Sequence, residues 1–170
     1  MTIDVFGADE QLDGDVPLST MVALTRAVLE AEGIRGGAEV SLLFVDEPTI
    51  TELNERFLGK EGPTDVLSFP IEDEPLASGR TPDAGGPGPG EQSEPEAPAL
   101  LGDVVICPRV AARNAQTGGV SYDDELALLV VHGTLHLLGW DHELDEEAER
   151  MEARERALLV AHYSETWTGR

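Results

Sequence analysis

The chain has 170 residues, of which 34 are acidic and 11 are Lys or Arg, so its formal net charge is −23. This length suits one domain, at roughly 100–200 residues per domain, and a hydrophobic content of 41% excludes both wholesale disorder and a membrane bundle. The negative field repels phosphate backbones, which excludes a protein that coats nucleic acid through bulk electrostatics. Cys107 is the only cysteine, so neither an intrachain disulfide nor a cysteine-based zinc cluster can form. With no signal-peptide pattern at the N-terminus, we expect a cytoplasmic protein.

The first half of the chain predicts strands and helices in alternation. In chain order these elements span residues 2–6 (strand), 16–32 (helix), 40–45 (strand), 48–58 (helix) and 65–69 (strand). Asp15 is expected to cap the first helix, and Gly33 ends it. Pro48 opens the second helix, whose apolar stripe includes Phe57 and Leu58.

The second half predicts one more strand and three helices. They span residues 102–107 (strand), 108–118 (helix), 122–138 (helix) and 144–161 (helix). Ser121 and Asp124 form a capping-box-like start for the helix over 122–138, which is apolar nearly all round and should be the buried central helix. The pattern predicts an α+β fold, with α/β-like alternation, in which a small mixed four-stranded sheet packs with about five helices.

Residues 72–99 differ from the rest of the chain because they are rich in proline, glycine and acidic residues. This composition predicts a flexible surface insert. We therefore expect a single metal-dependent hydrolase domain over residues 1–162, interrupted by the insert, and a short tail over 163–170.

Three of the four histidines, His132, His136 and His142, lie close together in the sequence. Because residues four apart on a helix project from the same face, His132 and His136 suit two ligands of one metal ion. Gly139 allows the chain to turn, so that His142 can return as the third ligand. Three neutral imidazoles leave one tetrahedral position for water, the arrangement of a catalytic zinc site, here with one Zn²⁺ per chain. The alternative, core histidines satisfied by hydrogen bonds, needs partners for two imidazoles on a leucine-rich helix.

This histidine spacing is also the ligand frame of metzincin proteases. Those enzymes place a glutamate directly after the first histidine as general base, and here that position is Gly133. The chemistry must therefore use the zinc-bound water unaided, a base from elsewhere, or a nucleophile of the substrate. Asp141 either orients a ligand imidazole or caps the last helix, and we expect His162 to be an exposed bystander.

The segment HGTLHLLGWDH at 132–142 resembles the H-G-x-L-H-L-x-G-[YW]-D-H motif of the YbeY family of bacterial zinc-dependent endoribonucleases, also called rRNA maturation factors. Two further matches are GPTDVLSFP at 62–70, with Leu53-Asn54 upstream, and the pair Gly102-Asp103 at the start of a strand. These motifs follow the family's order and span the chain except for the insert.

The resemblance implies that His132, His136 and His142 hold the metal and that the turn containing Thr64 lies near the cleft. It also implies cleavage of single-stranded RNA, a part in 3′-end maturation of the small-subunit (16S) rRNA and in ribosome quality control, and the small ribosomal subunit with its assembly proteins as partners. No membrane partner is expected. Many members carry an arginine where this chain has Leu58.

Bound RNA would require local positive charge. Arg109 and Arg113 lie four residues apart on one helix face and form one candidate pair, with Arg56 and Lys60 on the other side of the cleft. The alternative is that these residues are solvated surface charges. Asp65 and Asp103, at two strand starts, are candidates for a base or for orienting a ligand; turn formation is the alternative role for both. No catalytic residue beyond the zinc-bound water is assigned.

Two rival functions fit parts of the pattern. One is a metzincin-like zinc peptidase that lacks the usual glutamate base, and the other is a ribosome-assembly protein with structural zinc.

Overall fold

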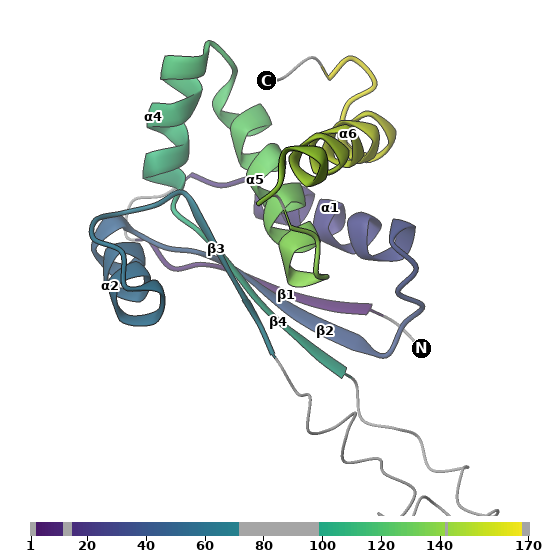
Figure 1. The fold of residues 1–170 in the computed structure, drawn as a ribbon, viewed down its shortest axis with the longest axis horizontal. Coiled ribbons are helices and arrows are strands. Elements are labelled where there is room, and N and C mark those ends of the chain that lie inside the picture. The colour runs from purple at the N-terminus through teal and green to yellow at the C-terminus, as the bar shows by residue number, and fades with distance from the viewer. Residues whose placement is uncertain (1–2, 12–14, 72–98, 142, 168–170) are drawn as a thin grey trace, which may run out of the picture.

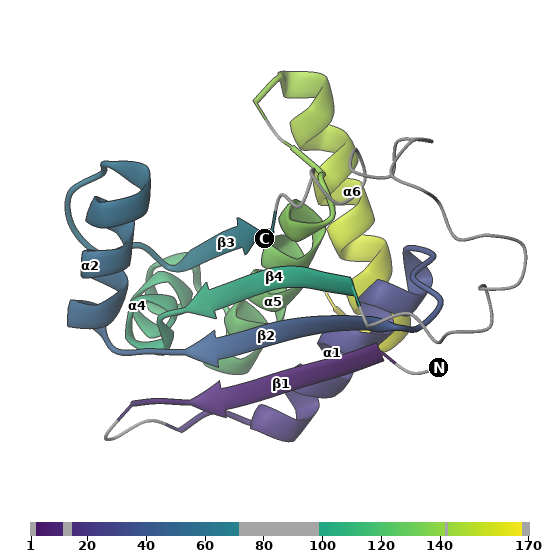
Figure 2. The ribbon, with the colours of Figure 1, turned by 90° about the horizontal axis from the view of Figure 1, so that it is seen from below.

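The computed structural model describes residues 3–11, 15–71, 99–141 and 143–167. Its four strands form one sheet in the order β1 (Ile3–Asp9), β2 (Ala38–Phe44), β4 (Ala99–Ile106) and β3 (Val66–Pro70). The first three of these strands are parallel, and β3 runs antiparallel to β4 at the edge (Figure 2). The small mixed sheet predicted from the sequence is confirmed.

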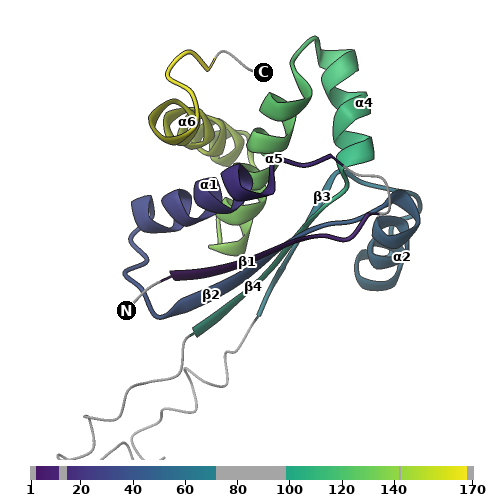
Figure 3. The same ribbon diagram turned by 180° about the vertical axis from the view of Figure 1, so that it is seen from behind.

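Five helices surround the sheet in the described part of the chain. They are α1 (Leu18–Ala31), α2 (Glu47–Leu58), α4 (Pro108–Gly118), α5 (Tyr122–Leu137) and α6 (Asp145–His162). Helices α1, α5 and α6 lie over one face of the sheet, whereas α2 packs against the other face near one end (Figures 1 and 3). The fold is therefore α+β, as expected.

Helix α5 lies at the centre of the molecule, and its local sequence explains where it begins. Ser121 occupies the N-cap and its side chain accepts a hydrogen bond from the backbone N–H of Asp124 at 3.1 Å. Buried apolar residues point toward the sheet, α1, α4 and α6, and include Leu126, Val130 and Leu135. The nearly all-round apolar sequence of α5 thus reflects its contacts with the sheet and with three helices.

The start of α1 differs from the prediction. Pro17 is the N-cap, and no side chain caps the helix, so the assignment of Asp15 as its cap is wrong. The backbone carbonyl of Asp15 instead accepts a hydrogen bond from the Tyr122 hydroxyl at 2.9 Å, which ties the segment before α1 to the start of α5.

Helix α2 keeps only part of its predicted stripe in contact with the core. Ile50 and Asn54 are buried, whereas Phe57 and Leu58 are 56% and 50% exposed. The Asn54 side-chain amide donates to the carbonyl of Gly62 at 2.9 Å and so fixes the turn that leads into β3. The last turn of α2 therefore presents its apolar residues outward.

The remaining segments affect the domain prediction in two ways. Residues 72–98 of the predicted insert lie outside the described residues, and Ala99 already belongs to β4. Trp167, in the region predicted as a tail, is only 9% exposed and packs with the main core. None of the helices described is long and apolar enough to cross a membrane.

Candidate functional site

Two of the three predicted metal ligands, His132 and His136, lie one turn apart on α5. Their ring centroids are 4.6 Å apart, with the ring planes at 78° to one another. Both side chains are half-buried and line a cavity of about 400 Å³ beside β3, with Leu58 of α2 also in its wall. The helix therefore presents two imidazoles side by side on a surface that solvent can reach.

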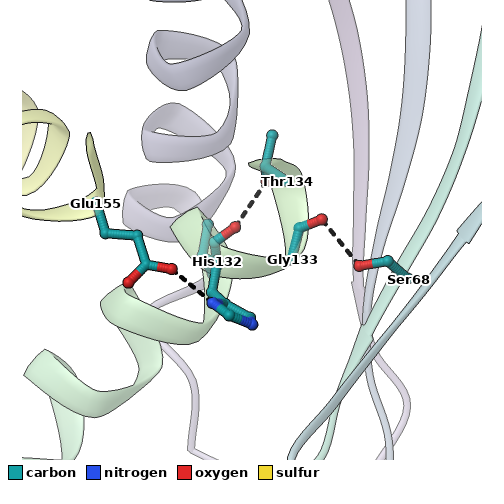
Figure 4. Close-up of polar contacts among 6 residues, drawn as sticks. Ser68, His132, Gly133, Thr134 and Glu155 are labelled. Carbon is teal, nitrogen blue, oxygen red and sulfur yellow. Dashed lines mark hydrogen bonds and ion pairs between the residues drawn. The ribbon is translucent and has the colours of Figure 1, made fainter. Parts of the chain in front are cut away.

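Glu155 of α6 contacts the first histidine. Its Oε2 lies 2.5 Å from Nδ1 of His132, and the two side chains point directly at one another in Figure 4. The Glu155 side chain is only 9% exposed. A carboxylate in this position fixes the imidazole tautomer and the ring orientation, as partners of metal-bound histidines do. This residue was missed, because the acidic segment around it suggested a solvated helix.

Gly133, next to His132, faces the sheet rather than the cavity. A Cβ added at this position would lie 2.7 Å from Cγ1 of Val104 and 3.1 Å from Cγ2 of Val66. The Ser68 hydroxyl donates to the Gly133 carbonyl at 2.8 Å, which holds β3 close to α5 (Figure 4). The position that carries the base in metzincins therefore has no room for a side chain and points away from the histidines.

A second cavity, of about 460 Å³, is lined mainly by residues of α5 and α6 and also by His132. Asp65, Val66 and His132 line both cavities. The two cavities therefore meet at the first histidine.

Asp65 lies where these cavities meet, at the start of β3. Its Oδ1 accepts a hydrogen bond from the backbone N–H of Val66 at 2.8 Å, and its Oδ2 accepts one from the Asn114 amide at 3.2 Å. The Thr64 hydroxyl is 3.5 Å from Asp65 Oδ1. The predicted turn is thus close to the histidines. Asp103 lies within β4, opposite Phe69 of β3, so its predicted place at a strand start is wrong.

The basic residues favoured for RNA contact are all exposed: Arg56, Lys60, Arg109 and Arg113. Arg113 forms an ion pair with Glu47, and the Arg56 guanidinium lies 5.4 Å from the ring centroid of Phe57. In the part of the chain that the structure describes, the only Arg or Lys lining the two cavities at His132 is Arg156 of α6. Arg156 is not among the residues predicted from the sequence.

A carboxylate after α1 joins the elements on either side of His142. Glu32 Oε1 accepts a hydrogen bond from the Trp140 indole N–H at 3.0 Å, and its Oε2 accepts one from Arg154 Nε at 2.6 Å. Trp140 is two residues before His142, which lies outside the described residues, and Arg154 is next to Glu155. Glu32 therefore anchors the loop that leads to the third predicted ligand.

Three other polar candidates have simple outcomes. The N-cap of α6 is Leu144, so Asp141 does not cap that helix. His162 is exposed at the end of α6, as expected. Burial raises the pKa of the Cys107 thiol, which disfavours the reactive thiolate.

Among the described residues no group of three or more His, Cys, Asp or Glu side chains is placed to hold a metal ion.

Comparisons with known proteins identify the family. The family model described as endoribonuclease YbeY matches residues 8–162. The endoribonuclease YbeY of Salinispora tropica is 45% identical over 148 residues, which cover 86% of this chain and 88% of that protein. That of Beutenbergia cavernae is 46% identical over 139 residues, covering 81% and 84%.

A solved structure supports the fold as well. The solution structure of a protein from Thermotoga maritima matches with a TM-score of 0.58 and 25% identity, over 96% of this chain and 91% of that one. The family match spans α5 with its two histidines, β3 and α6. The chain belongs to the YbeY endoribonuclease family.

Proposed function

We propose that this endoribonuclease uses one zinc ion, held by His132, His136 and His142, to cleave single-stranded RNA. The observation that carries the proposal is the contact between Glu155 and Nδ1 of His132, beside a second imidazole one turn away. A buried carboxylate on one imidazole nitrogen is the usual support for a histidine whose other nitrogen ligates a metal.

The residues in place fit zinc. The two described imidazoles come from one rigid helix and reach a cavity, and zinc commonly takes three histidines with a fourth position open in catalytic sites. A bound zinc ion would polarise a phosphodiester oxygen and lower the pKa of a water molecule toward about 7.

The protein residues around the histidines would position the proposed metal ligands and supply a proton acceptor. Glu155 holds the His132 ring, and Glu32 anchors the segment before His142. Asp65 presents a carboxylate, fixed by Val66 and Asn114, at the junction of the two cavities, where it is our candidate for accepting a proton from the nucleophile.

The shape and charge of the site favour an unpaired strand. The two cavities meet at His132, so a single strand can follow them past the histidines, whereas few basic residues are present to hold a rigid duplex. Since the net charge is −23, we propose that affinity for naked RNA is weak and that proteins of the small ribosomal subunit bring the rRNA 3′ end to the enzyme in the cytoplasm.

The test combines metal analysis with cleavage of defined RNA. Purified protein should contain about one zinc per chain and should cut a single-stranded oligonucleotide but not the same sequence in a duplex. His136→Ala should lose both zinc and cleavage. Cleavage that persists after complete removal of metal would refute the zinc mechanism, and small-subunit binding with no cleavage at all would favour an assembly role.

A further inference from the structure

The cavity between α5 and α6 is not explained by metal binding. It has a volume of about 460 Å³, and its lining includes both His132 and Trp167. Its walls are mainly apolar, with Leu128 and Leu129 on α5 and Met151 on α6. A mostly apolar cavity of this size with a few polar groups is typical of a site for a small ligand or part of one.

Polar residues line this cavity from three elements: Asp65 before β3, His132 on α5, and Glu152, Glu155 and Arg156 on α6. Glu152 and Arg156 are four residues apart on α6, so they project from the same face, and both are exposed. A nucleobase has the matching character, because it combines an apolar face with an edge that carries donors and acceptors. Proteins that read single-stranded RNA bind unstacked bases against apolar or aromatic side chains and arginine guanidinium groups.

The position of the cavity favours a base of the substrate over an unrelated ligand. His132 lines this cavity, so an occupant would lie close to a phosphodiester bound at the histidines. Arg156 is also the one Arg or Lys that lines either cavity within the described residues.

We propose that the α5–α6 cavity is a nucleobase subsite for the nucleotide next to the cleaved bond, with Arg156 and Glu152 contacting the polar edge of the base. The proposal rests on the RNA-cleaving function proposed above. It makes Arg156 of α6 a substrate-binding residue.

The test uses a set of single-stranded oligonucleotides that the enzyme cuts at a single bond. Each oligonucleotide carries one abasic site, placed at a different position relative to that bond. At one position next to that bond, loss of the base should raise KM about tenfold for the wild-type enzyme, the size expected for one stacked base. The variant Ala148→Phe fills the cavity, so its KM for the intact substrate should already be about tenfold higher than that of the wild type. The abasic site should then raise the KM of this variant little further.

Replacement of single arginines on α6 distinguishes a contribution of the cavity to RNA binding from the general effect of positive charge. Arg156→Ala should weaken binding of the intact oligonucleotide to the zinc-free protein, measured by fluorescence anisotropy, by about fivefold or more. Arg150→Ala removes the same charge from an exposed position on α6 and should retain the wild-type affinity. Circular dichroism would verify that Ala148→Phe is folded.

The outcomes distinguish the subsite from the overall function. If the wild-type enzyme cuts no RNA, the proposed function fails. The subsite is refuted, while the function stands, if the enzyme cuts RNA but every abasic site changes KM equally in the wild type and in Ala148→Phe. It is also refuted if Arg156→Ala and Arg150→Ala lower the affinity for RNA equally.

Discussion

Replacement of Glu155 tests the proposal that the carboxylate beside His132 supports metal binding. Glu155→Gln keeps the size of the side chain but removes the charge from a contact of 2.5 Å at a position that is only 9% exposed. Losing such a partner lowers metal affinity by roughly 10–100-fold, or about 1.4–2.7 kcal/mol. The glutamine oxygen can still accept a hydrogen bond from Nδ1–H of His132. We therefore expect the loss of zinc affinity to lie near the lower end of this range in Glu155→Gln and near the upper end in Glu155→Ala.

The assay is competition for zinc against a chromophoric chelator, which reports affinity independently of RNA cleavage. Glu149→Gln, an exposed change of the same kind on α6, serves as the control and should match the wild type. If folded Glu155→Gln and Glu155→Ala both bind zinc as tightly as Glu149→Gln, the argument that Glu155 supports a metal-bound His132 is refuted.

Three further predictions concern other parts of the structure. Gly133→Ala should lower the free energy of unfolding by about 2 kcal/mol in urea, because its Cβ would overlap Val104, and an unchanged midpoint would contradict the packing. Leu58→Arg should tighten binding of single-stranded RNA and steepen its log–log salt dependence by about one; an unaltered slope would place residue 58 away from the phosphates. Burial raises the pKa of Tyr122 to about 12, so the folded state favours the neutral phenol. Stability should therefore fall as pH rises from about 10, the value for an unfolded tyrosine, toward 12, and a loss of equal size in Tyr122→Phe urea titrations would exclude this tyrosine as its source.

The elements and the histidine pair were predictable because their signals are local. The i, i+4 spacing of His132 and His136, the Ser121 cap and the apolar sequence of α5 all lie within one helix. The start of α1 was not predictable in the same way, since Asp15 has the side chain of a good cap but Pro17 takes the N-cap position.

The support around the histidines depends on contacts between distant segments. Glu155 lies 23 residues beyond His132, in a helix whose many acids suggest exposure. Its spacing from Met151 and Leu158 is the one local signal, because it places a carboxylate within an apolar stripe. Glu32 lies 108 residues from Trp140, and no pattern in the sequence connects them.

The hydrogen bond between Glu32 and Trp140 also suggests a use for the intrinsic fluorescence of the protein. The chain has two tryptophans: Trp140 is two residues from the third proposed ligand, and Trp167 lines the α5–α6 cavity. The emission of each indole depends on its immediate surroundings, so each should respond to a different ligand. With single Trp→Phe variants, intrinsic fluorescence can follow zinc at Trp140 and RNA at Trp167 without an attached dye.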